Sequence, residues 1–135
     1  MIGRMLTGPI GLVVILWIAL SLSCGEASDE ERDYLREYCG VLDVFSDNLV
    51  EQQSAVSIAD AMRALIRDLS SISPPTSLAE FHREFIDFVE ESLEDPGSLV
   101  VGEAPKPPEP VRLKLSGAER GIDECVDAEP FKIAE

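Results

Sequence analysis

Few side chains in this chain are of the types that carry out catalysis or bind metal ions. The 135 residues include one histidine, His82, and three cysteines. A zinc site needs three or four histidine, cysteine or carboxylate ligands, and the sequence has no HExxH motif. No serine or cysteine has a histidine partner that its spacing singles out. We therefore expect no catalytic residue and no metal site, and we expect His82 to be a residue at the boundary of the core.

Nucleotides, calcium and nucleic acids are also poor candidates as ligands. Neither GxxxxGK[ST] nor GxGxxG occurs, so phosphate binding has no motif to support it. The acidic segments 29–33 and 90–95 lack the alternating oxygen ligands and the glycine of an EF-hand loop. With 26 acidic and 11 basic residues, the net charge of −15 opposes contact with a phosphate backbone. We expect no cofactor and no nucleic-acid partner.

The most informative chemistry lies at the N-terminus. Arg4 precedes a run from Leu6 to Leu22 that contains no charged residue. This run is at the lower limit for crossing a bilayer, and Gly8-Pro9 interrupts it. A basic start, an apolar stretch and small residues at the end are the anatomy of a signal peptide. The sequence therefore predicts an export signal over residues 1–23.

The residues around Cys24 extend this interpretation. Ser23, Cys24 and Gly25 are followed by a polar, acidic run, and this arrangement resembles the signal of bacterial lipoproteins. Ser21 stands where that family favours leucine. The resemblance covers residues 1–25 and implies a lipid on Cys24, which would become the N-terminus of an extracytoplasmic protein anchored to the cell membrane. Ordinary cleavage with secretion and an uncleaved single-pass anchor remain open as alternatives.

Lipidation of Cys24 would leave Cys39 and Cys125 as one pair. Disulfides persist in the oxidising compartments that exported proteins reach. A bridge between them would close a loop of roughly 86 residues and contribute about 4–5 kcal/mol of stability. We expect this disulfide, with two separate buried thiols as the alternative.

Three segments repeat apolar residues at spacings of three and four, the period of a helix that faces a core. They predict helices over about 29–53, over about 56–71, and from Thr76 or Ser77 to the turn at 95–97. Ser28 or Asp29 is expected to cap the first helix. Ser77 and Glu80 have the spacing of a capping box for the third.

The C-terminal third is less regular. Segment 102–110 contains four prolines in nine residues and predicts an extended connector. A short extended piece over 111–115 and a final helix over about 116–127 follow. Residues 128–135 are expected to form a flexible tail.

Together these elements predict an all-α fold. We expect a small antiparallel bundle of three to four helices over residues 31–127, stapled by one disulfide and preceded by an N-terminal signal or anchor helix. Residues 24–30 would form an acidic tether. Removal of residues 1–23 takes away one charged side chain, Arg4, so the net charge changes from −15 to −16.

Acidic residues recur at helical spacing along the third predicted helix. They suggest a possible docking face for a basic partner of the cell envelope, although such a face also serves solubility. Its members are Glu80, Glu84, Asp87, Glu91 and Glu94.

The leading hypothesis for function is a non-enzymatic, membrane-tethered binding or interaction module outside the cytoplasm. The general shape resembles small bacterial envelope lipoproteins with a helical domain, a resemblance that names no activity. The alternative is a carrier of a small molecule, metal or haem in an aromatic bundle core. That core would draw on Tyr34, Tyr38, Phe45, Phe81, Phe85 and Phe88.

Overall fold

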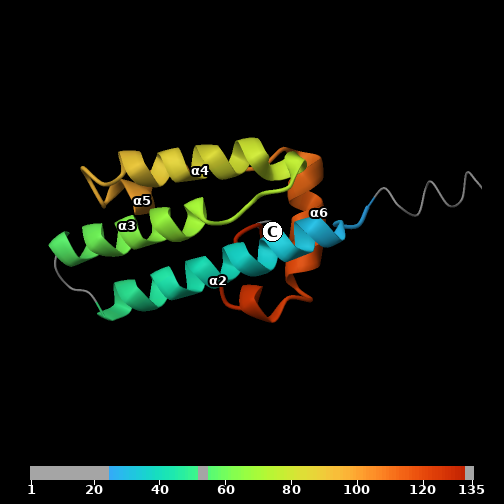
Figure 1. Ribbon diagram of the computed structural model, residues 1–135, viewed down its shortest axis with the longest axis horizontal. Helices are drawn as coiled ribbons and strands as arrows, with labels where there is room; N and C mark the ends of the chain where they lie inside the picture. The colour runs from blue at the N-terminus through green and yellow to red at the C-terminus, as the bar shows by residue number, and fades with distance from the viewer. Residues whose placement is uncertain (1–24, 52–54, 133–135) are drawn as a thin grey trace, which may run out of the picture.

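Three long helices lie side by side in the computed structural model, and a shorter helix crosses one end of them (Figure 1). The structure describes residues 25–51 and 55–132. The long helices are α2 (Asp29–Glu51), α3 (Ala55–Ser70) and α4 (Ala79–Glu91), and the crossing helix is α6 (Glu109–Glu119). Helices α2, α3 and α4 alternate in direction. Across the two described ranges there is no strand, so the predicted all-α bundle is confirmed.

Helix α2 begins where the sequence predicts, with Ser28 as its cap. The Ser28 hydroxyl accepts a hydrogen bond from the Glu31 amide at 3.2 Å, and the Glu31 carboxylate accepts one from the Ser28 amide at 2.9 Å. This reciprocal pair is a capping box. Ala27, just before the cap, is buried. The stretch predicted as a tether, 24–30, therefore already includes packed residues and the start of the helix.

The long helices pack through the apolar stripes that their sequences predict. Helix α3 contacts both α2 and α4. Leu35 of α2, Met62 and Leu69 of α3, and Val89 of α4 are fully buried. Each such side chain stabilises the fold by about 1.5–3 kcal/mol relative to an exposed one.

The start of α4 differs from the sequence prediction. Residues Thr76–Leu78 form a 3-10 turn, and α4 follows with no side-chain cap. The Ser77 hydroxyl donates its hydrogen bond to the Glu31 carboxylate instead, at 2.9 Å. Glu31 is buried, and a buried carboxylate needs hydrogen-bond donors. The predicted capping box between Ser77 and Glu80 is therefore absent, and Ser77 contacts the start of α2 instead.

The predicted C-terminal helix was placed too late in the chain. Helix α6 spans Glu109–Glu119, so it includes the segment 111–115 that alternation suggested could be extended. Pro110 lies in its first turn, where a proline is tolerated because the missing N–H would have no helical partner. The extended connector is accordingly shorter than the predicted 102–110. A separate 3-10 turn, η2 (Asp123–Cys125), follows α6.

The predicted disulfide is present. Cys39 and Cys125 are bonded, their Cα atoms are 5.0 Å apart, and both side chains are fully buried. Cys125 lies in η2 and not in a fourth antiparallel helix. The bond therefore attaches the crossing C-terminal segment to the middle of α2.

The C-terminal segment is packed further than the sequence predicts. Residues 128–135 were expected to form a flexible tail, yet Phe131 belongs to the core, with 4% of its surface exposed. The last described residues return to the middle of the helical layer (Figure 1).

The N-terminal export signal, the anchor helix and Cys24 lie outside the described residues. Among the helices of 25–51 and 55–132, none combines the length and the apolar character needed to cross a membrane.

Candidate ligand-binding site

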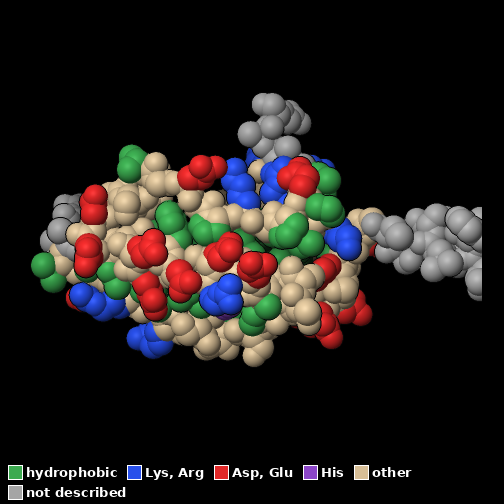
Figure 2. Space-filling view, turned by 90° about the horizontal axis from the view of Figure 1, so that it is seen from above, with side chains coloured by type: hydrophobic (Ala, Val, Ile, Leu, Met, Phe, Trp, Pro, Cys, Tyr) green, Lys and Arg blue, Asp and Glu red, His purple; other side chains and the backbone are tan. Residues whose placement is uncertain are grey.

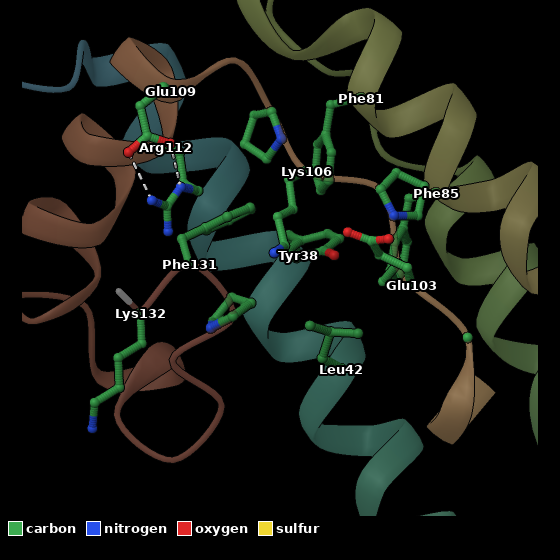
Figure 3. Close-up of a pocket in the computed structure, with 15 residues that line it drawn as sticks. Tyr38, Leu42, Phe81, Phe85, Glu103, Lys106, Glu109, Arg112, Phe131 and Lys132 are labelled. Carbon is green, nitrogen blue, oxygen red and sulfur yellow. Dashed lines mark hydrogen bonds and ion pairs between the residues drawn. The ribbon is translucent and has the colours of Figure 1, made fainter. Parts of the chain in front are cut away.

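A pocket of about 730 Å³ opens between α2, α4, the proline-rich connector and the C-terminal segment. Its floor is aromatic and its rim is charged (Figure 3). The floor residues are Tyr38, Phe81, Phe85 and Phe131, and the charged rim residues are Glu103, Lys106, Glu109, Arg112 and Lys132. A volume of this size lies within the range of small-molecule sites.

Tyr38 of α2 lies at the centre of the aromatic floor. Its ring stacks on Phe131 at a centroid distance of 5.7 Å and meets Phe81 and Phe85 edge-on at 6.0 and 5.6 Å. Phe81 and Phe131 are also in edge-on contact at 5.5 Å. These geometries are the favoured ones for aromatic pairs, so the floor is a set of rings held in place by one another.

The Tyr38 hydroxyl is the unusual polar group of the site. Only 2% of the Tyr38 surface is exposed, and the hydroxyl forms no hydrogen bond with another described residue. No buried side-chain oxygen of the described residues lacks a partner, so the small exposed part of Tyr38 includes this oxygen. Burial, together with the nearby Tyr34, raises the pKa of Tyr38 well above its usual value. The group therefore stays a neutral phenol that can both donate and accept a hydrogen bond.

Two of the three cations on the rim already have partners. Arg112 donates two hydrogen bonds to the Glu109 carboxylate, at 2.8 and 3.0 Å, and Lys132 pairs with Glu129 at 2.8 Å. These Arg112 hydrogen bonds are the main reason why the pKa of Glu109 is lowered. Lys132 points away from the floor in Figure 3.

Lys106 and Glu103 are the rim charges without an ion pair. Neither forms a salt bridge within residues 25–51 and 55–132. Both belong to the connector, and their side chains extend over Tyr38 (Figure 3). A cation, an anion and a phenol thus lie together over an aromatic floor.

Three of the six aromatic residues that the sequence offers for a binding core line this pocket: Tyr38, Phe81 and Phe85. Tyr34 faces His82 instead, and Phe45 and Phe88 pack against the core elsewhere. Sequence reasoning missed Phe131 and Lys106. The only sequence signal is that Lys106 and Phe131 each lie next to a proline. A proline indicates a turn or connector, but it does not indicate which residues pack against that segment.

His82 was expected at the core boundary but is buried, with 5% of its surface exposed. Its Nε2 atom donates to the Leu69 carbonyl oxygen at 2.9 Å, so Nδ1 accepts from the Tyr34 hydroxyl at 3.0 Å. Burial lowers the His82 pKa, an effect that the Leu69 hydrogen bond partly offsets. Both ring nitrogens are occupied, which leaves neither for a substrate or a metal.

A second buried ionisable group lies near the C-terminal segment. The Glu119 carboxylate accepts a hydrogen bond from the Phe131 amide at 3.2 Å. Burial raises the Glu119 pKa, and that hydrogen bond opposes the rise. The contact holds the backbone of Phe131, and with it one ring of the pocket floor.

The predicted acidic docking face is exposed to solvent along α4 and the turn that follows it. All five members, Glu80, Glu84, Asp87, Glu91 and Glu94, have exposed side chains. Figure 2, which looks down on α4, shows acidic side chains gathered on this side. None of the five forms an ion pair with another described residue.

A metal centre finds no support in the described segments, where no three His, Cys, Asp or Glu side chains are grouped for an ion. Comparison of the chain with protein-family models, with curated proteins and with solved structures finds no match to any of the three.

Proposed function

We propose that this protein is an exported, membrane-tethered binding protein without catalytic activity, and that it holds a small organic molecule in the aromatic pocket. The observation that carries the proposal is the Tyr38 hydroxyl, which lines the pocket beside the aromatic floor and forms no hydrogen bond with another described residue. A neutral phenol that opens onto a pocket can donate a hydrogen bond to a bound molecule or accept one from it. The proposal combines the two hypotheses from the sequence, a membrane-tethered binding module and a carrier of a small molecule.

The sequence supports the tether. Residues 1–23 have the anatomy of a signal peptide, and Cys24 has the surroundings of a lipidated cysteine. Helix α2 begins at Asp29, so only a few residues would separate the anchor from the bundle. Tyr38 lies nine residues further on, about 14 Å along the helix. A lipid on Cys24 would therefore keep the pocket close to the membrane surface.

Native mass spectrometry tests the binding function. The full-length protein, purified from the membranes of its own host, is expected to carry one added mass per chain. Leu42→Trp fills the pocket, since Leu42 is one of its lining residues, and should release that mass. Leu113→Trp is the matched control, because Leu113 is half exposed on α6 and does not line the pocket. An unloaded wild type, or equal loading of both variants, would contradict the proposal.

The acidic face of α4 supports a second candidate, docking of a basic envelope protein. Its five carboxylates form an exposed negative surface, which speeds encounter with a positive partner. A variant with Glu84→Lys, Asp87→Lys and Glu91→Lys should lose a crosslinked partner. The matched control changes Asp43, Asp47 and Glu51 of α2 to lysine, an equal change in net charge. If both variants retain the partner, α4 is an ordinary solvated face.

A further inference from the structure

We propose that the pocket ligand is a compact zwitterion with a flat apolar body, of the class of free α-amino acids with an aromatic side chain. This inference rests on the proposed binding function and adds the ligand's chemistry. Lys106 would bind the carboxylate, Glu103 the ammonium group, and the Tyr38 hydroxyl would donate to the carboxylate. The aromatic floor would receive the ring.

Two charged residues of the rim, Lys106 and Glu103, have no ion-pair partner in the described part of the chain. Arg112 and Lys132 have carboxylate partners of their own, whereas Lys106 and Glu103 have no ion pair among the described residues. They lie three positions apart in one connector and reach over the same floor (Figure 3). A ligand with one charge would leave one of them facing a like charge, while a zwitterion satisfies both.

The aromatic floor of the pocket indicates the chemistry of the uncharged part of the ligand. Four aromatic rings, those of Tyr38, Phe81, Phe85 and Phe131, line the pocket. Tyr38, Phe81 and Phe131 are only 2–4% exposed and Phe85 is partly buried, so a ligand ring would pack mainly against Phe85 and the exposed edges of the other three. The Tyr38 phenol is neutral and unpartnered at this surface, so it can donate to an oxygen of the ligand. A polar head beside a flat apolar body matches this arrangement.

The connector that carries both charges is held in position by its contacts. Pro107, next to Lys106, is buried. Gly102, next to Glu103, lies so close to the Ser98 carbonyl and the Phe88 ring that a Cβ there would be 2.4 Å from the former and 3.3 Å from the latter. The two charges are therefore presented by a packed segment, which reduces the ordering that ligand binding would require.

The test pairs each charge of the protein with one charge of the ligand. L-phenylalanine is titrated into the full-length protein by calorimetry, beside phenethylamine, which lacks the carboxylate, and 3-phenylpropanoate, which lacks the ammonium group. We expect L-phenylalanine to bind, and each analogue to bind about tenfold more weakly, because a hydrogen bond to a charged group is lost.

Variants then assign the contacts. Lys106→Met should weaken the binding of L-phenylalanine about tenfold without weakening that of phenethylamine, and Glu103→Gln should weaken the binding of L-phenylalanine without weakening that of 3-phenylpropanoate. Tyr38→Phe keeps the ring but removes the hydroxyl. It should weaken the binding of L-phenylalanine and 3-phenylpropanoate, which carry a carboxylate, and not the binding of phenethylamine. Lys106 and Glu103 are exposed, so these substitutions leave the core intact, and equal thermal unfolding of the variants confirms it.

Equal binding of all three compounds, equal losses for every pairing, or no binding at millimolar concentration would overturn this inference. The proposed function fails separately. If native protein carries another molecule that Leu42→Trp displaces, the pocket binds ligands but its ligand is not this zwitterion.

Discussion

Single hydrogen bonds of His82 connect all three long helices of this protein. Tyr34 lies in α2, Leu69 in α3 and His82 in α4, and the imidazole bonds to the other two at 3.0 and 2.9 Å. Because a carbonyl oxygen accepts and never donates, the Leu69 contact requires a proton on Nε2. In the neutral imidazole Nδ1 then has no proton, and it accepts the hydrogen bond from the Tyr34 hydroxyl. This residue has a structural role, which its position between Phe81 and Arg83 in the sequence does not reveal.

The burial of His82 predicts a dependence of stability on pH. Its pKa in the folded protein is lower than 6.5, so the unfolded chain binds a proton more readily. Its contribution to stability is complete above pH 6.5 and is lost as the pH falls below that value. The slope is at most about 1.4 kcal/mol per pH unit.

Urea unfolding at several pH values, from about 7.5 down to about 5.5, measures this effect. We expect the advantage of the wild type over His82→Gln to shrink as the solution is acidified. The difference between the two proteins cancels the contributions of other groups, such as Glu119. Parallel curves for wild type and variant would show that His82 does not titrate differently on folding.

At the scale of elements, the disulfide determines where the C-terminal segment lies. Cys125 follows the crossing helix α6, and its bond to Cys39 brings the following residues against α2. Phe131, six residues further on, stacks on Tyr38, which is one residue before Cys39. The bond thus supports the pocket floor as well as the core.

Removal of the disulfide should therefore destabilise the protein strongly. Cys39→Ala with Cys125→Ala is expected to cost about 4–5 kcal/mol, because the bond closes a long loop in the unfolded chain. Urea unfolding of wild type and variant, each with and without a reducing agent, gives this difference. The reductant should affect only the wild type. A loss below about 1 kcal/mol would mean that packing alone holds the C-terminal segment.

Two glycines should respond to alanine in opposite directions. Gly102→Ala would place a Cβ 2.4 Å from the Ser98 carbonyl oxygen, and such overpacking costs about 1–3 kcal/mol. Gly40 is interior to α2 with no neighbouring atom within 4 Å of an added Cβ, so Gly40→Ala should gain about 0.5–1 kcal/mol. Thermal unfolding of both variants tests this, and a shift of the same sign in both would contradict it.

At the scale of the whole molecule, the pocket is assembled from five parts of the chain, one of which is α6 with Glu109 and Arg112 on the rim. Tyr38 comes from α2, Phe81 from α4, Lys106 from the connector and Phe131 from the C-terminal segment. The rim contains three of the few basic residues of a chain with net charge −15. The carboxylates of α4 instead face solvent. Binding chemistry and the acidic surface are therefore two distinct features of the molecule.

The proposed anchor predicts the distribution of the whole protein between membrane and soluble fractions. Full-length wild type should incorporate a fatty-acid label and sediment with membranes, and Cys24→Ala should lose the label. Cys39→Ala is the matched control, since that thiol is in the disulfide, and should keep it. Label on the Cys24→Ala protein, or unmodified wild type free in the medium, would contradict lipid anchoring at this residue.

The sequence alone predicts the parts of this fold that depend on neighbours along the chain. Apolar residues at spacings of three and four predict α2, α3 and most of α4, because a helix repeats its core-facing side at that interval. Ser28 predicts the start of α2 for a similarly local reason. Near the C-terminus the prediction is wrong, because the prolines of 102–110 indicate an extended connector, whereas Pro110 occupies the first turn of α6.

The tertiary structure alone decides which distant residues meet. The Cys39–Cys125 pairing was expected from the cysteine count, but not its location in a turn beyond a crossing helix. The stacking of Phe131 on Tyr38, the burial of His82 and the position of Lys106 over the aromatic floor join residues far apart in the chain. No periodicity records such contacts, because they follow from the packing of whole helices and the closure of a long loop. Local sequence thus predicts the helices and an export signal, and the packing of the chain assembles the pocket of the proposed binding site.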